Sequence, residues 1–147
     1  MAKAAHRLHV AEPRVAYLNR PPLVADASVI AAALFGEAGN AEALALLRGR
    51  SLHAPHLLDY EIASVGLKKL RREAVSSEAV AAALRAYGRL PIERHAVDVQ
   101  SVASIAERHG LTAYDAAYLW VAEQIEAPLA TLDERLGNAA RSYLAPT

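Results

Sequence analysis

Short apolar segments alternate with longer helical patterns along most of the chain. Four short runs rich in apolar residues predict strands, at residues 23–25, 52–55, 92–97 and 129–131. Apolar residues at helical spacing, bounded by Ser, Thr, Asp or Gly, predict helices at residues 28–35, 41–48, 57–72, 77–90, 99–109, 112–126 and from 133 onward. This alternation is typical of a short parallel sheet flanked by helices, so we predict an α/β fold in which helix predominates.

Composition narrows the class of protein. The chain has 147 residues, of which 54% are hydrophobic and 22% charged, as expected for one ordered domain. Two consecutive prolines, Pro21 and Pro22, predict a boundary between an N-terminal extension at 1–21 and a single domain at 22–147. The chain has no cysteine, no apolar run of about 18 residues and no uncharged N-terminal segment, which predicts a cytoplasmic protein without a membrane span.

Charge is balanced overall but unevenly distributed. The first 21 residues carry four basic side chains and one acid, so the remainder of this neutral chain has a net charge of −3. An acidic body argues against binding nucleic acid by charge alone. It remains compatible with a basic patch beside an acidic pocket.

Four carboxylates occupy positions where charge is unexpected. Asp26 and Asp133 follow predicted strands, at the sheet edge where α/β proteins bind ligands. Glu61 shares a helix face with apolar residues, whereas Asp59 lies nearer the helix start, where an acid is ordinary. Asp115 begins a helix that is apolar almost all round and is therefore predicted to be central. The two strand ends and two helix faces can converge on one pocket.

Each of these acids also has an ordinary structural explanation. Asp26 or Ser28 could cap the following helix, and Asp133 could cap the last one. Residues 112–115 match a capping box, and Glu61 could be an exposed helix acid. The case for a site therefore rests on the four acids together.

Four carboxylates in one pocket would repel one another strongly unless cations bind or their pKa values rise. The chain has no cysteine, and its six histidines form no HxH or HxxxH pair. An oxygen-only ligand set favours Mg²⁺ or Mn²⁺.

At these residues the sequence resembles the PIN-domain nucleases, and specifically the VapC-type toxins of bacterial toxin–antitoxin systems. The resemblance covers residues 23–144 and is carried by the segments LVADASVI, LLDYEIAS, LTAYDAAYLWVAE and LATLDERL, in that order. It implies a PIN-like three-layer fold, in which a short parallel sheet is flanked by helices. It also implies metal-dependent endoribonuclease activity, in which metal-activated water cleaves single-stranded or looped RNA and leaves 5′-phosphate and 3′-hydroxyl ends.

The resemblance also assigns roles to residues. By matching position, it implies that four acids are catalytic and hold the Mg²⁺ or Mn²⁺ ions, namely Asp26, Glu61, Asp115 and Asp133. Ser28 and Thr131 match hydroxyl positions that orient these acids. A cognate antitoxin and a homodimer are further implications, whereas the family predicts no role for residues 1–21.

Positive side chains are needed to hold RNA. The candidate contacts are Lys68, Lys69, Arg71 and Arg72 at the end of the helix bearing Glu61, together with Arg135 and Arg141 on the last helix. The ordinary explanation for the first four is a favourable interaction with a helix C-terminus.

Two other functions remain open at this point. The first is a non-toxin PIN-type nuclease, and the second is a catalytically silent binding module whose acidic pocket receives a basic partner. Phosphoryl transfer through an aspartyl nucleophile is less well supported, because the chain has lysine only at positions 3, 68 and 69.

Overall fold

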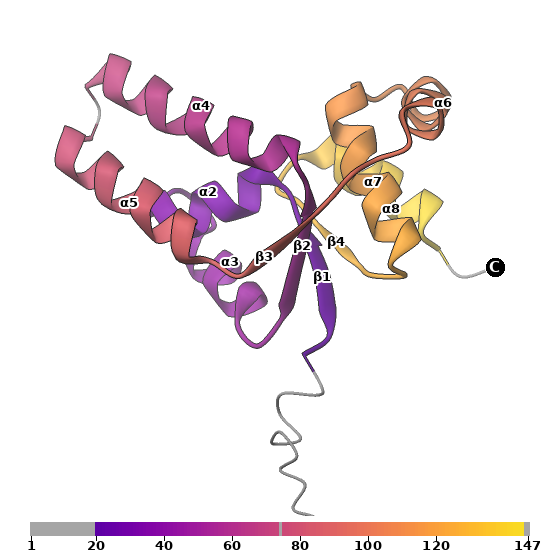
Figure 1. Cartoon of the computed structure of the whole chain (residues 1–147), viewed down its shortest axis with the longest axis horizontal. Helices are drawn as coiled ribbons and strands as arrows, with labels where there is room; N and C mark the ends of the chain where they lie inside the picture. Colours follow the sequence, from indigo (N-terminus) through magenta and orange to yellow (C-terminus); the bar gives the residue numbers. More distant parts are fainter. Residues whose placement is uncertain (1–19, 74, 146–147) are drawn as a thin grey trace, which may run out of the picture.

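A four-stranded parallel sheet forms the centre of the fold (Figure 1). The computed structural model describes residues 20–73 and 75–145. The strands are β1 (Pro22–Ala25), β2 (Ser51–Pro55), β3 (Ile92–His95) and β4 (Leu129–Ala130). Their order in the sheet is β3-β2-β1-β4, and every neighbouring pair is parallel. The predicted α/β class is confirmed.

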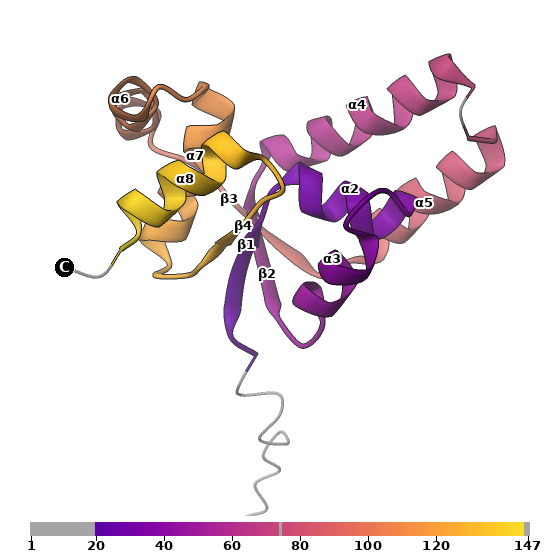
Figure 2. The same ribbon diagram turned by 180° about the vertical axis from the view of Figure 1, so that it is seen from behind.

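Helices cover both faces of this sheet. They are α2 (Ala27–Phe35), α3 (Asn40–Leu47), α4 (Leu57–Arg72), α5 (Ser77–Arg89), α6 (Val99–His109), α7 (Ala113–Gln124) and α8 (Glu134–Tyr143). The front and back views show α2 to α5 on one side of the sheet and α6 to α8 on the other (Figures 1 and 2). The predicted three-layer arrangement is therefore present.

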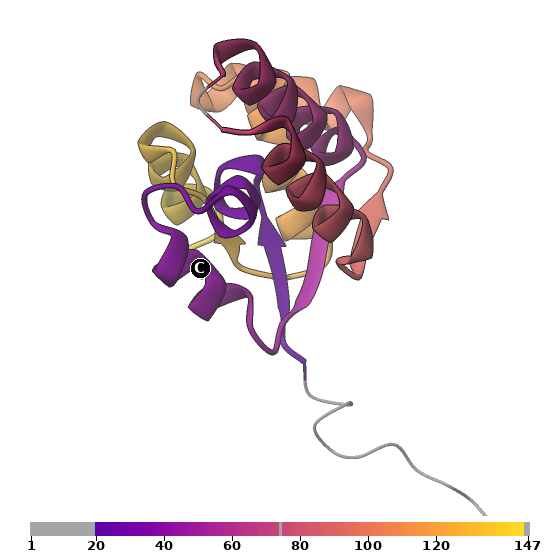
Figure 3. The same cartoon turned by 90° about the vertical axis from the view of Figure 1, so that its left-hand side faces the viewer.

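The strand order creates a switch point between β1 and β4. The chain first builds outward from β1 to β2 and β3, and then returns through α6 and α7 to add β4 on the opposite side of β1. Figure 3 shows the sheet from one side, with α4 and α5 nearest the viewer. In open parallel sheets, the carboxyl ends of strands at such a switch point form a crevice that binds ligands.

Packing in the core explains why hydrophobic and polar residues do not alternate along the strands. Leu23, Val24 and Ala25 of β1 are all buried, because both faces of the parallel sheet are covered by helices. Helix α7 contacts β1, β2 and β4. Its buried residues are Ala116, Ala117, Tyr118, Leu119, Val121 and Ala122. The prediction that this helix is central is confirmed.

Several element ends differ from the sequence-based predictions by one or two residues, and three of them have an evident local cause. Strand β3 stops at His95, two residues early, ahead of the Asp98 cap of α6. Helix α7 stops at Gln124 because Glu126 adopts a left-handed conformation, with φ of 52°. Strand β4 stops before Thr131, whose side chain turns to the pocket described below.

The predicted extension, residues 1–21, lies mostly outside the described residues, so its role stays a prediction. The backbone of Ser51 donates to the Pro21 carbonyl at 3.1 Å, immediately before β1. In residues 20–73 and 75–145, no single helix is long and apolar enough to cross a membrane. One bent pair, α2 with α3 at 110°, meets that test by length and composition only.

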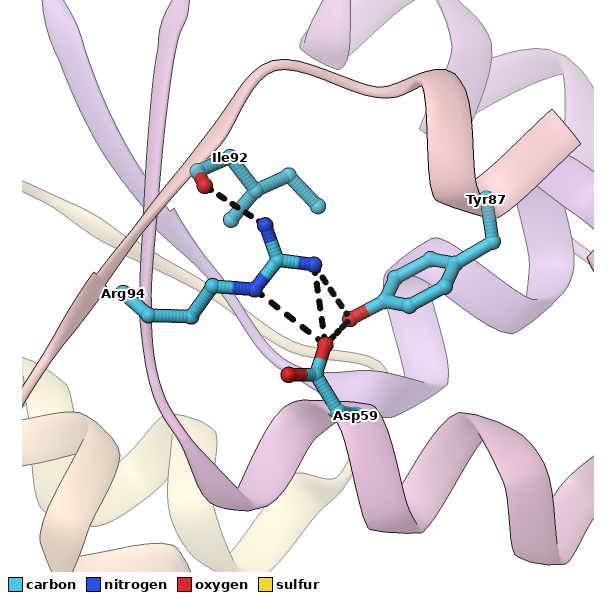
Figure 4. Close-up of polar contacts among 4 residues, drawn as sticks. All are labelled: Asp59, Tyr87, Ile92 and Arg94. Carbon is cyan, nitrogen blue, oxygen red and sulfur yellow. Dashed lines mark hydrogen bonds and ion pairs between the residues drawn. The ribbon is translucent and has the colours of Figure 1, made fainter.

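A polar clamp formed by Asp59, Tyr87 and Arg94 joins α4, α5 and β3 (Figure 4). Arg94 donates from Nε and Nη2 to Asp59 Oδ1, at 3.2 and 2.8 Å, and Tyr87 donates to the same oxygen at 2.6 Å. Arg94 Nη1 also donates to the Ile92 carbonyl at 2.7 Å. The Arg94 guanidinium, with the Tyr87 hydroxyl, holds the pKa of Asp59 below its usual value. Asp59 thus stabilises the helix layer, as its position near the helix start suggested.

Arg94→Met is expected to destabilise the protein in a pH-dependent way. At pH 6 we expect the free energy of unfolding to fall by about 1 kcal/mol, a small effect because Asp59 and Arg94 are partly exposed. Since the folded-state pKa of Asp59 is depressed, the contribution of the pair is fully present above about 3.9, the unfolded-state pKa. It is lost as the pH falls through the folded-state pKa. Urea unfolding of both proteins at pH 6 and pH 2.5 checks this, and an undiminished difference at low pH would contradict it.

Candidate active site

Asp26 lies directly after β1, at the carboxyl end of the strand from which the sheet extends in both directions. It caps α2, with its Oδ1 accepting from Val29 N at 3.2 Å. Ser28 Oγ donates to the same oxygen at 2.5 Å, and Thr131 Oγ1 donates to Oδ2 at 2.5 Å. The carboxylate is 6% exposed and is the one buried charged side chain in the described part of the chain. The alternative that Ser28 caps this helix is wrong, because Ser28 lies inside the first turn.

The two hydroxyls also tie Asp26 to the loop after β4. Ser28 Oγ accepts from Leu132 N at 2.9 Å, and Thr131 Oγ1 accepts from Asp133 N at 3.0 Å. Each hydroxyl therefore donates to Asp26 and accepts from the loop that carries Asp133. Asp133 in turn caps α8, its Oδ1 accepting from Leu136 N at 2.8 Å. The expected supporting contacts of Ser28 and Thr131 are both present.

The Glu61 side chain contacts α7, whereas Asp59 on the same helix contacts α5 and β3 through the polar clamp. Glu61 Oε1 accepts from the Tyr118 hydroxyl at 2.7 Å, which links α4 to α7. Tyr118 was not predicted from the sequence as a residue of the site. Its spacing was the available signal, because residue 118 follows Asp115 by three positions and so shares its helix face. The partner of that hydroxyl, 57 residues away, could not be read from spacing.

Asp115 has both of the roles that its sequence context allowed. Its backbone N–H donates to Thr112 Oγ1 at 3.1 Å, so the capping interaction of residues 112–115 is present. Its carboxylate also experiences repulsion from Asp133 and Asp26. Capping of α7 therefore places this carboxylate at the pocket.

The electrostatics show that the four acids share one environment. Burial raises the pKa of Asp26 despite the opposing hydrogen bonds from Ser28, Thr131 and Val29 N. Burial also raises the pKa of Glu61, with further repulsion from Asp26 and Asp115. The pKa of Asp115 is raised by burial and then by Asp133 and Asp26. These like charges from four separate segments would be relieved by a bound cation.

The donor set fits a hard divalent cation. In residues 20–73 and 75–145, no lysine or arginine forms an ion pair with any of the four acids. Arg135 is near enough to lower the pKa of Asp115 slightly against the larger raising effects. Every side-chain donor is a carboxylate or hydroxyl oxygen, the ligand type that Mg²⁺ and Mn²⁺ prefer.

The candidate RNA-contacting residues do not all reach this pocket. Arg135 lies in the first turn of α8, two residues after Asp133, whereas Lys68, Arg71 and Arg72 lie at the end of α4 that points away from the sheet (Figure 1). Lys69 is already paired with Glu37 at 2.6 Å. Arg141 donates to Asn138 on its own helix. Arg135 is thus the basic side chain best placed beside the acids.

The histidines differ from the sequence-based expectation. No pair has a ligand-like spacing along the chain, yet His53 and His95 lie in hydrogen-bond contact although they are 42 residues apart. With Glu93 they form the one group of three in the described residues whose ligand atoms lie within 4.8 Å of one another. The pairing of β2 with β3 produces this cluster.

A parallel α/β sheet with acidic residues near its switch point is the architecture in which such sheets bind ligands. The PIN domain family model matches residues 23–142, which include all four acids. Ribonuclease VapC9 of Mycobacterium tuberculosis is 38% identical over 122 residues, covering 82% of this chain and 92% of that protein. Ribonuclease VapC3 of Pyrobaculum aerophilum is 32% identical over 129 residues, covering 84% and 98%. The chain therefore belongs to the PIN-domain family and, within it, to the VapC ribonucleases.

Solved structures support the same fold. The crystal structure of PAE2754 from Pyrobaculum aerophilum superposes with a TM-score of 0.67 at 25% identity, covering 82% of this chain and 81% of that one. VapC20 of Mycobacterium tuberculosis, described as a sarcin–ricin loop cleaving toxin, superposes with a TM-score of 0.58 at 16% identity. That likeness covers 80% of this chain and 94% of the other, and it supports the fold alone. The predicted PIN-like fold is confirmed.

Proposed function

We propose that this VapC-family ribonuclease is a Mg²⁺- or Mn²⁺-dependent endoribonuclease and the toxin of a toxin–antitoxin pair. The observation that carries the proposal is that four acids lie close enough to repel one another, while no described lysine or arginine forms an ion pair with them: Asp26, Glu61, Asp115 and Asp133. When bound there, a divalent cation supplies an activated water and neutralises charge on the phosphate. The names of the VapC relatives, which are ribonucleases, support RNA as the substrate.

The residues around the acids have distinct positioning roles in this proposal. Ser28 and Thr131 donate to different oxygens of Asp26 and so fix the plane of its carboxylate. Tyr118 fixes Glu61 by donating to Oε1, which leaves the other oxygen for a cation. Burial raises the pKa of Tyr118 and keeps its hydroxyl protonated, so it stays a donor. No side chain is needed as a nucleophile.

RNA is held by basic side chains outside the acidic set. Arg135 is the first contact that we propose, because it lies beside Asp133 and close enough to Asp115 to affect its pKa. Lys68, Arg71 and Arg72 are proposed to contact RNA farther along α4. Lys69 would have to leave Glu37 to join them.

The proposed partners follow from family membership. We expect a cognate antitoxin that covers the acidic pocket with a basic segment, and a homodimer of the toxin in the cytoplasm. The pocket suits such a segment because its charge is negative and, in the described part of the chain, unpaired. Copurification with the product of a neighbouring reading frame tests the pairing.

Removal of metal is expected to stop RNA cleavage reversibly. We expect the purified full chain to cut a structured RNA pool in Mg²⁺ or Mn²⁺, to lose activity in EDTA, and to regain it when either ion is restored. Mapping of the fragment ends should show 5′-phosphate and 3′-hydroxyl groups. Cleavage that persists in EDTA, or fragments with 2′,3′-cyclic phosphate ends, would contradict the proposal.

Thr131→Val is expected to reduce cleavage without unfolding the protein. Valine keeps the shape of threonine but removes the donor to Asp26 Oδ2 and the acceptor for Asp133 N. Loss of such a supporting contact typically costs about 10–100-fold in activity or metal affinity. Ser76→Ala, which removes the capping hydroxyl of α5, a helix that carries none of the four acids, is the control. Equal activity of Thr131→Val and the parent protein would exclude the positioning role.

A further inference from the structure

A second cluster of metal-ligand side chains lies at the opposite edge of the sheet from β4. His53 on β2 pairs in register with Glu93 on the edge strand β3, and His95 follows two residues later on the same face of that strand. His53 Nδ1 lies 2.9 Å from His95 Nε2 and 3.6 Å from Glu93 Oε2. Three ligand groups from two strands thus converge on one point, although nothing in the nuclease proposal uses them.

We propose that His53, His95 and Glu93 bind a Zn²⁺ ion. Zinc bonds to imidazole nitrogen and carboxylate oxygen are about 2.0–2.2 Å long, which places two tetrahedral ligand atoms about 3.3 Å apart. The observed separations, 2.9 and 3.6 Å, lie on either side of that value. Glu93 is 68% exposed, so its side chain can close on the ion with little repacking. Two imidazoles and one carboxylate favour zinc over Mg²⁺.

Ser51 supplies the supporting contact that a metal-binding histidine requires. The Ser51 hydroxyl lies 3.1 Å from His53 Nε2, the ring nitrogen that faces away from the cluster. When Nε2–H donates to this hydroxyl, the lone pair of His53 resides on Nδ1, which points to His95 and Glu93. In this tautomer, His53 Nδ1 is available to coordinate the ion.

This cluster differs from the acidic pocket in position and in chemistry. The acids gather around the ends of β1 and β4, whereas His53 and Glu93 lie within β2 and β3. Three protein ligands leave a fourth zinc position for water or for a group from a partner. An ion here would link the edge strand β3 to β2 through side chains, in addition to the backbone ladder. The inference does not depend on the proposed nuclease function.

Zinc titration of a variant that lacks the acidic site tests the proposal. The protein is the full chain carrying Asp26→Asn and Asp115→Asn, and the probe is Zn²⁺ measured by calorimetry, with Co²⁺ absorption as a second readout. We expect one Zn²⁺ per chain and a rise in thermal unfolding temperature on binding. Adding His53→Ala or His95→Ala should weaken binding at least about 100-fold, and Ser51→Ala about 10-fold. Exposed His56→Ala is the matched control and should leave binding unchanged.

The outcomes separate coordination from a simple hydrogen bond between the two rings. Absence of Zn²⁺ binding to the acid-deficient variant would overturn the proposal, as would full binding after His95→Ala. If His53→Ala fails to fold, Glu93→Gln decides, because this exposed residue can be changed without loss of the fold. Unchanged Zn²⁺ affinity in Glu93→Gln would contradict the three-ligand site.

Discussion

Asp26→Asn is expected to abolish RNA cleavage while leaving the protein folded. Asparagine keeps the size of the side chain but removes the charge that we propose binds a divalent cation. Because loss of a supporting contact alone costs about 10–100-fold, loss of this ligand should reduce the cleavage rate by at least about 100-fold. Cleavage of a labelled RNA by matched amounts of both proteins, over a series of Mn²⁺ concentrations, measures the effect.

The melting temperature of the Asp26→Asn variant distinguishes a protein that has lost only its site from one that has lost its fold. Burial raises the pKa of Asp26, so its ionised form is unfavourable in the folded state at neutral pH. Neutral asparagine removes that penalty but also loses part of the hydrogen bonding from Ser28 and Thr131. We therefore expect the melting temperature to shift by only about 4 °C or less. Retained cleavage in a folded Asp26→Asn protein would show that Asp26 is not part of the site.

Glu61→Gln and Asp59→Asn are expected to have opposite phenotypes. The two acids lie on the same helix, but Glu61 faces Tyr118 and the pocket, whereas Asp59 faces Arg94 and Tyr87. Glu61→Gln should reduce cleavage by at least about 100-fold without loss of stability, since burial and repulsion already disfavour its charge. Asp59→Asn should retain cleavage within about threefold and lower the free energy of unfolding by about 1 kcal/mol.

Both variants lie on α4. Each substitution preserves the size of its own side chain and removes one negative charge. Their comparison therefore isolates the direction in which each carboxylate points. Cleavage assays and urea unfolding on both proteins provide the measurement. Equal loss of activity in the two variants would mean that disturbance of α4, and not the loss of a pocket ligand, causes the effect.

Much of this architecture could be predicted because the sequence signals were local. Buried parallel strands appear in the sequence as short runs of apolar residues. Helix starts are marked by capping residues such as Asp98 and Asp133, whose side chains accept a hydrogen bond from the backbone. The switch-point rule predicted that Asp26 and Asp133 lie near each other, and Thr131 Oγ1 contacts both, because it donates to Asp26 Oδ2 and accepts from Asp133 N. The contacts of Ser28 and Thr131 followed from the family resemblance.

The contacts that were missed join residues far apart in the chain. Tyr118 meets Glu61 only because α4 and α7 both reach the end of the sheet, and Arg94 meets Asp59 only because β3 lies beside β2. His53 and His95 likewise meet through strand pairing. Spacing along a sequence identifies metal ligands on one helix or one strand, but it carries no signal for ligands on neighbouring strands. Strand order and register were needed to reveal them.

The four carboxylates are proposed to form one divalent-cation site. Calorimetric titration of Mn²⁺ into the full chain and into its Asp26→Asn/Asp115→Asn variant measures whether they do. We predict saturable Mn²⁺ binding to the unaltered protein and its loss in the variant, with the circular dichroism spectrum unchanged. Equal Mn²⁺ binding by both proteins, or no binding by the unaltered chain, would contradict the metal-dependent mechanism and favour an acidic pocket that only receives a basic partner.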